Sequence, residues 1–161
     1  MTTADLAACL RREIELAAGI VSTLDEQLKA LLGLDLAGLE ASVPALDELI
    51  EELRRAEGRR QAAAGVIAAE YGLDADAPLR ELLAALPAPE RRELEQARRR
   101  LGALIEEICR LNHANYALML NAARFNRAVL QFVAGTAATY ARDGAPGEAG
   151  EARSLIFNQE A

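Results

Sequence analysis

A seam of mostly apolar residues, spaced alternately three and four apart, runs through the second half of the chain. Side chains at an average spacing of 3.5 residues stay on one stripe of a helix only when partner helices wrap around it. The seam therefore predicts one very long helix that packs against other helices. Its members are Leu94, Ala97, Leu101, Leu104, Ile108, Leu111, Asn115, Leu118, Ala122, Phe125, Val129, Phe132 and Thr136.

The first half of the chain has the patterns of two partner helices. Residues 7–31 and 36–71 each carry a seam of the same period. Thr3 is placed to cap the start of the first helix, and Gly33 is expected to end it in the left-handed conformation. Asp35 is then expected to open the second helix.

Proline and glycine mark the connection to the last helix. Residues 72–78, GLDADAP, indicate a loop in which Asp74 or Asp76 caps a short helix over residues 79–86. This short helix can cover one end of the bundle. Pro89 suits the first turn of the last helix, because the N–H that proline lacks has no helical partner there.

Three residues interrupt the apolar seam of the second helix. Pro44 falls within it, so we expect either a restart capped by Ser42 or a kink. Glu57 and Arg60 are three residues apart on the inward stripe, where they can form an ion pair along one helix face. Either this pair is structural or it presents a charge to a bound partner.

Together these patterns predict an all-α fold, an elongated antiparallel bundle of three long helices plus one short helix. We expect residues 1–140 to form the bundle domain and residues 141–161 a mobile C-terminal tail, because Gly, Ala, Glu and Arg dominate after Tyr140. An apolar cluster at residues 155–157 could dock on the bundle or on a partner. Because the long helices differ in length, part of the last one should remain uncovered.

Composition excludes several classes of function. The net charge of −7 argues against nucleic acid and anionic membranes as partners. The chain has neither a signal-peptide pattern nor a run of about 18 apolar residues, so we expect a cytoplasmic protein without membrane insertion. Cys9 and Cys109 lack metal-ligand spacing, and His113 is the one histidine. Without a phosphate-binding loop or a catalytic constellation, we expect no enzyme activity and no cofactor.

Asparagines recur inside the most apolar part of the last helix. A buried amide without partners costs about 1 to 3 kcal/mol, so each must form hydrogen bonds. Either they fix the register of the helices, or they line a groove that receives a guest helix. The candidate groove residues are Leu111, Asn112, Asn115, Leu118, Met119, Phe125, Asn126, Val129 and Phe132.

The same stretch resembles a known family. The pattern LN..N..L is followed by a further asparagine and leucine and then by TY..DG, with the matching residues Asn112, Asn115, Leu118, Asn126, Leu130, Thr139, Tyr140, Asp143 and Gly144. A weaker match is Glu57 followed by Arg60. This pattern resembles the flagellar export chaperone family FlgN, and the order of helices also fits.

The resemblance implies a cytoplasmic type III export chaperone. It would bind amphipathic C-terminal helices of the hook-associated proteins FlgK and FlgL, prevent their premature assembly, and deliver them to the export gate. Tyr140, Asp143 and Gly144 match the closing motif and are candidates for contact with the cytoplasmic domain of the gate protein FlhA. Tyr140 could equally pack on the bundle. The alternative function is a homo-oligomeric coiled-coil adaptor or scaffold without a flagellar client, which includes a possible homodimer.

Overall fold

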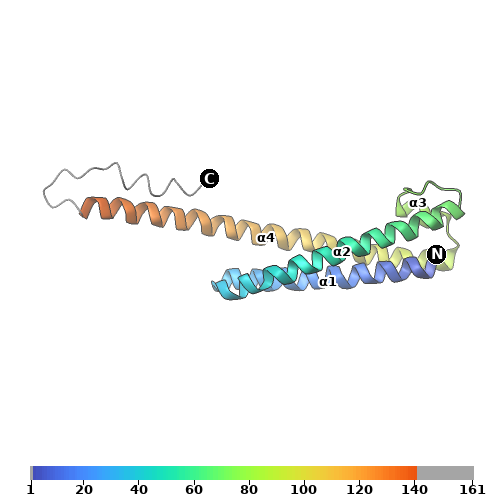
Figure 1. Cartoon of the computed structure of the whole chain (residues 1–161), viewed down its shortest axis with the longest axis horizontal. Helices are drawn as coiled ribbons and strands as arrows, with labels where there is room; N and C mark the ends of the chain where they lie inside the picture. The colour runs from blue at the N-terminus through green and yellow to red at the C-terminus, as the bar shows by residue number, and fades with distance from the viewer. Residues whose placement is uncertain (1, 141–161) are drawn as a thin grey trace. The chain divides into compact units, whose positions relative to one another are not determined.

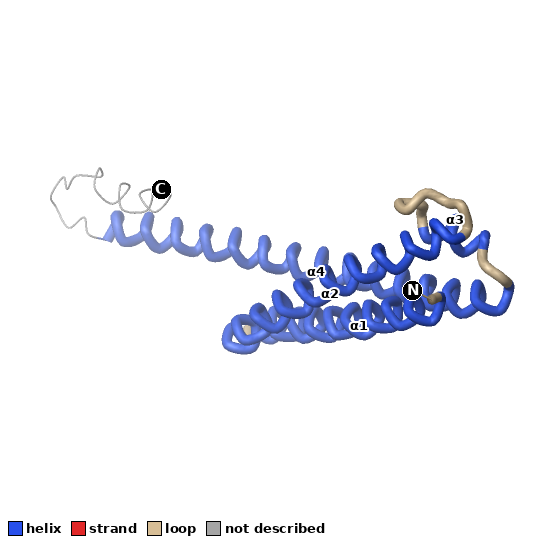
Figure 2. The backbone as a smooth tube through the Cα atoms, turned by 45° about the vertical axis from the view of Figure 1, so that its right-hand side comes forward, coloured by secondary structure: helices blue, strands red, loops and turns tan. Residues whose placement is uncertain are grey.

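The computed structural model describes the backbone of residues 2–140 and the side chains of residues 2–134. Every element in this part of the chain is a helix (Figures 1 and 2). The predicted all-α fold with three long helices and one short helix is confirmed. The helices are α1 (Thr3–Gly33), α2 (Leu36–Glu70), α3 (Leu79–Ala85) and α4 (Ala88–Tyr140). The predicted tail, residues 141–161, lies outside the described residues.

The chain divides into two compact units, residues 1–116 and residues 117–161. In the first unit α1 and α2 run antiparallel, because they are joined by two residues and the side chain of Leu49 lies against Gly19. The first part of α4 runs parallel to α1. Arg11 near the start of α1 pairs with Glu93 at 3.0 Å, and Asn115 bonds to the backbone farther along α1.

One apolar cluster fills the end of the first unit where α1 begins. It combines bulky side chains with alanines of α2, and its buried members are Leu6, Ala7, Leu10, Ala63, Ala64, Ile67, Ala68, Leu82, Leu83, Leu86 and Leu94. The alanines allow the helices to approach closely. Leu82 and Leu83 of α3 belong to this cluster, so the short helix covers one end of the bundle as predicted.

A second cluster lies toward the other end of the first unit. Ile20 and Leu24 of α1 are buried there with Leu111 of α4. Half-buried side chains of α2 and α4 complete it, namely Leu46, Leu49, Ile50, Leu53 and Ile108. All three long helices therefore contribute to the core of the first unit.

Both ends of α1 differ by one residue from the prediction. Thr2, not Thr3, is the N-cap, and its hydroxyl accepts a hydrogen bond from the Asp5 backbone N–H at 3.3 Å. Leu34, not Gly33, adopts the left-handed conformation, with φ of 57°. The predicted cap of α2 is confirmed, because Asp35 Oδ1 accepts a hydrogen bond from the Gly38 N–H at 2.9 Å.

The other proline and cap predictions have mixed outcomes. Helix α2 continues through Pro44, so a restart capped by Ser42 is wrong, and the Ser42 hydroxyl instead donates to the Leu39 carbonyl at 2.6 Å. Helix α3 has Pro78 at its N-cap and no side-chain cap, so Asp74 and Asp76 do not cap it. Pro89 does lie in the first turn of α4, which begins at Ala88.

Candidate functional site

The seam of α4 is buried in its first part. Leu94, Leu111 and Asn115 are each 1% exposed, and every described residue that is fully buried lies at or before Asn115. Between them, Leu101, Leu104 and Ile108 are half-buried. This part of the seam packs into the two clusters of the first unit.

Beyond Leu118 the same seam is exposed. Phe125 is 68% exposed and Phe132 is 71% exposed, although both positions continue the three-and-four spacing. We define the α4 apolar face as the side chains of Leu118, Met119, Ala122, Phe125, Val129, Leu130, Phe132 and Val133. At 100° per residue, these eight side chains lie within an arc of about 160° around the helix.

The opposite side of this helix segment is mixed, with polar side chains around the exposed Leu120. Arg124, Arg127 and Gln131 lie there by the same helical period. A contiguous exposed apolar surface with a polar border marks an interaction site in a folded protein. The arrangement can bind another amphipathic helix, and it contains no group suited to covalent chemistry.

The structure divides the predicted groove residues into two sets. Leu111 and Asn115 are buried in the first unit and contribute to its core rather than to an accessible surface. Asn112 is exposed in the first unit. The second set lies on residues 117–134 and consists of Leu118, Met119, Phe125, Asn126, Val129 and Phe132, of which only Leu118 is half-buried.

The predicted export-gate residues lie at the edge of the described chain. Tyr140 is the last residue of α4, and its side chain is not described. Asp143 and Gly144 lie outside the described residues. Their role stays a prediction.

Asn115 connects α4 to α1. Its Nδ2 donates to the Leu24 carbonyl of α1 at 2.9 Å, and its Oδ1 is buried without a protein hydrogen-bond partner. A single buried amide at a seam position can fix the register of packed helices. Whether Asn115 serves register or client recognition stays a prediction.

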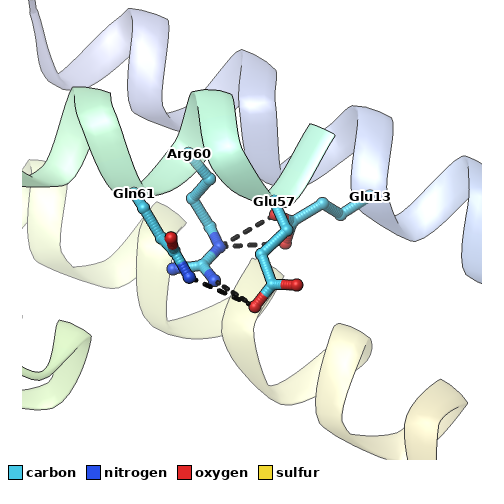
Figure 3. Close-up of polar contacts among 4 residues, drawn as sticks. All are labelled: Glu13, Glu57, Arg60 and Gln61. Atoms are coloured by element: carbon cyan, nitrogen blue, oxygen red, sulfur yellow. Dashed lines mark hydrogen bonds and ion pairs between the residues drawn. The ribbon is translucent and has the colours of Figure 1, made fainter. Parts of the chain in front are cut away.

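A buried ion pair that the sequence did not indicate connects α1 to α2 (Figure 3). Glu13 is 2% exposed, and Arg60 Nε lies 2.9 and 3.1 Å from its two carboxylate oxygens. Arg60 also pairs with Glu57 at 3.7 Å, as predicted, and Glu57 accepts a hydrogen bond from Gln61 at 3.3 Å. Burial raises the pKa of Glu13, and the Arg60 charge opposes that shift.

The site residue that sequence reasoning missed is therefore Glu13. It directly precedes Ile14 of the α1 seam, and the sequence analysis assigned it no position. The unusual signal was Arg60 on the inward stripe of α2, since an inward arginine needs a carboxylate across the helix interface. Because the pair is enclosed between α1 and α2, its role is to join these helices.

Residues 2–140 lack two further features, a membrane span and a metal-binding cluster. No helix there is long and apolar enough to cross a membrane. That stretch also contains no group of three or more histidine, cysteine, aspartate or glutamate residues that could hold a metal ion.

The described residues thus define an all-helical bundle protein whose last helix bears an exposed apolar face. A family model described as FlgN protein matches residues 1–148, so the chain belongs to the FlgN family. This is a family of flagellar export chaperones and is not known for enzymatic activity. No curated protein and no solved structure matches the chain.

Proposed function

We propose that this protein is a cytoplasmic export chaperone that binds amphipathic C-terminal helices of the hook-associated proteins FlgK and FlgL. Binding prevents premature assembly of these clients and delivers them to the export gate. The observation that carries the proposal is the exposure of the α4 apolar face in a member of the FlgN family. A chaperone needs such a surface, because its clients expose an apolar helix face before assembly.

The physical basis is burial of two apolar helix faces against each other. Each aliphatic or aromatic side chain that leaves water contributes roughly 1.5 to 3 kcal/mol. Loss of translational freedom and ordering of the client helix offset several kcal/mol of that gain. The balance favours an affinity that holds a client and still permits its release.

For delivery, we propose that Tyr140, with Asp143 and Gly144, contacts the cytoplasmic domain of FlhA. Support comes from the match to the closing motif and from the position of Tyr140 at the end of α4. Tyr140→Ala should weaken docking to the FlhA domain in a pull-down and leave client affinity unchanged. Loss of both activities would indicate that Tyr140 supports the fold instead.

Isothermal titration with peptides spanning the C-terminal helices of FlgK and FlgL tests client binding. We expect saturable one-to-one binding with a negative heat-capacity change. Phe125→Asp with Val129→Asp should reduce the affinity at least tenfold, because each carboxylate lies on the α4 apolar face. The matched control is Val66→Asp, which alters a valine that is 45% exposed on α2, and it should bind normally.

Light scattering on the free protein tests the alternative function, in which a second copy of the chain covers the α4 apolar face. A monomer that binds peptide supports the chaperone function. A stable homodimer that binds neither peptide would overturn it and indicate a self-associating scaffold.

A further inference from the structure

The turn between α1 and α2 exposes a second group of large apolar side chains (Figure 1). Leu34, which links the two helices, is 90% exposed. Leu32 just before it is also exposed, as are Leu36 and Val43 in the first turns of α2. Large apolar side chains that are exposed close together mark an interaction site in a folded protein. These residues belong to the first unit and are distinct from those of the α4 apolar face.

The net charge of the protein is concentrated around this turn. Residues 25–52 contain eight acidic residues and one basic residue, whereas the rest of the chain contains seventeen of each. The one basic residue, Lys29, is already paired with Asp25 at 2.7 Å. The exposed apolar side chains therefore lie in the part of the chain that carries its net negative charge.

The helical period places apolar and acidic side chains on one stripe of α2. We call this set the α2 acidic stripe, and its members are Leu36, Glu40, Val43 and Asp47. At 100° per residue they lie within an arc of about 60°, and all four are exposed. The stripe is centred about 100° away from the side chains that α2 contributes to the second cluster. Within residues 2–134, neither Glu40 nor Asp47 forms an ion pair.

We propose that the α2 acidic stripe, together with Leu34, is a docking surface for a basic amphipathic helix of a partner protein. The apolar side chains of the stripe contact the apolar face of that helix, and its lysines or arginines pair with Glu40 and Asp47. These two carboxylates are seven residues apart, which is about 10.5 Å along α2. A helix packed alongside would match them with basic residues seven positions apart, beside its apolar face. This surface goes beyond the proposed function, in which the client binds the α4 apolar face.

Charge argues against other occupants of the stripe. Nucleic acids and anionic membranes would be repelled by the acidic residues around it. Two copies of the chain that met stripe to stripe would bring Glu40 and Asp47 of one copy against those of the other, without a basic side chain between them. A basic amphipathic helix removes this repulsion and gains charge-assisted hydrogen bonds.

Titration calorimetry of the full chain with two synthetic helical peptides tests the proposal. Both peptides have the same composition and net charge, with leucines along one face. In the first peptide the lysines lie seven residues apart beside the leucines, and in the second they lie on the opposite face. We expect the first peptide to bind about fivefold more tightly, because only its lysines can reach the carboxylates. Its affinity should fall as salt screens the pairs.

The first protein variant removes the charges of the stripe. Glu40→Gln with Asp47→Asn should abolish the preference for the first peptide, because its lysines no longer have a partner. The matched control is Glu70→Gln with Glu106→Gln, which removes two exposed charges from α2 and α4 outside residues 25–52. The control should keep the preference.

The second variant removes the apolar contact. Leu36→Ser with Val43→Ser should weaken binding of the first peptide about tenfold, because less apolar surface is buried. The matched control is Val66→Ser with Ile105→Ser, which alters two exposed apolar side chains elsewhere in the first unit and should bind normally.

Three results would overturn the proposal. The first is that neither peptide binds or that both bind equally. The second is that the Glu70 and Glu106 control loses the preference as fully as the Glu40 and Asp47 variant, which would indicate a general charge effect. The third is a dimer of the free chain that dissociates in the Leu36→Ser, Val43→Ser variant, because a second copy would then cover the stripe.

The FlgK peptide separates this surface from the proposed function. It should bind both stripe variants as tightly as it binds the unaltered protein. If it fails to bind the unaltered protein while the first synthetic peptide binds, the chaperone function fails and the docking surface stands. If it binds while the synthetic peptides do not, the chaperone function stands and the docking surface is overturned.

Discussion

Glu13 and Arg60 illustrate how one buried pair connects distant parts of the sequence. Each side chain alone would be costly to bury, since an unpaired charge in a protein interior carries a large desolvation penalty. Their contact at 2.9 Å fixes α1 against α2 at a point where apolar side chains alone could slide. The family resemblance singled out Arg60 with Glu57, and the structure adds Glu13 as its closer partner.

Replacing Arg60 with methionine should therefore destabilise the protein by about 3 kcal/mol at neutral pH, because Glu13 stays buried without its partner. Chemical denaturation measures this loss. The control is Arg54→Met, which breaks an exposed pair with Glu51 on the same helix and should change stability by less than about 1 kcal/mol.

The loss in Arg60→Met should shrink as the pH falls. Burial already raises the pKa of Glu13 above 4.5, and removing Arg60 raises it further. The folded variant then binds a proton at a pH where the unfolded chain does not, so its stability rises as the pH falls through that window. A loss that is the same at pH 7 and pH 5 would show that Glu13 is not the unpaired group.

Asn115→Leu should keep or raise the unfolding free energy, by up to about 1 kcal/mol. The substitution removes a buried Oδ1 that has no protein partner, and it adds apolar contact with the second cluster. Light scattering should reveal whether the oligomeric state changes. Lost client binding with an unchanged fold would contradict a purely structural role for Asn115.

At the scale of the elements, helix packing decides which glycines can be replaced by a residue with a side chain. Gly102 lies within α4, and a Cβ added there would meet no atom within 4 Å. A Cβ on Gly65 of α2 would lie 3.0 Å from the backbone carbonyl oxygen of Ala75, which cannot move as a flexible side chain would. Gly102 is thus not required by packing, whereas the missing side chain of Gly65 allows the loop after α2 to pack closely against α2.

Gly102→Ala should accordingly stabilise the protein by about 0.5 to 1 kcal/mol through helix propensity. Gly65→Ala should destabilise it, because the steric conflict outweighs the same gain. Thermal unfolding of the two variants under identical conditions checks both. Equal stabilisation would mean that the loop over residues 72–78 does not pack against α2.

The long helices differ in length. Helix α1 has 31 residues and α2 has 35, whereas α4 has 53. A helix rises 1.5 Å per residue, so neither α1 nor α2 is long enough to match the whole of α4. The seam is buried or half-buried at most positions through Leu118 and exposed from Ala122 to Phe132.

At the scale of the whole molecule, local signals predicted the elements well. Asp35 and Pro89 act within one helical turn, and apolar periodicity identifies a helix without knowledge of its partners. Burial depends on contacts with residues far along the chain, so the buried position of Glu13 could not be predicted. For the same reason, the seam pattern did not distinguish the buried Leu111 and Asn115 from the exposed Phe125. The left-handed conformation was predicted for Gly33, but Leu34 adopts it.

A chain truncated after residue 118 should unfold at nearly the same temperature as the full chain. All fully buried residues in the described part lie at or before Asn115, so truncation removes little buried apolar area. Client binding should be abolished. A fall in the unfolding temperature of more than about 5 °C would show that residues 119–161 stabilise the first unit.

Hydrogen–deuterium exchange of the full chain, free and saturated with the FlgK peptide, tests the central claim most directly. We predict that amides of residues 117–134 exchange quickly in the free protein and become strongly protected by the peptide, because the peptide covers the α4 apolar face. Amides of α1 and α2 should change little. Protection confined to the exposed leucines around Leu34, or no protection in residues 117–134, would contradict the account.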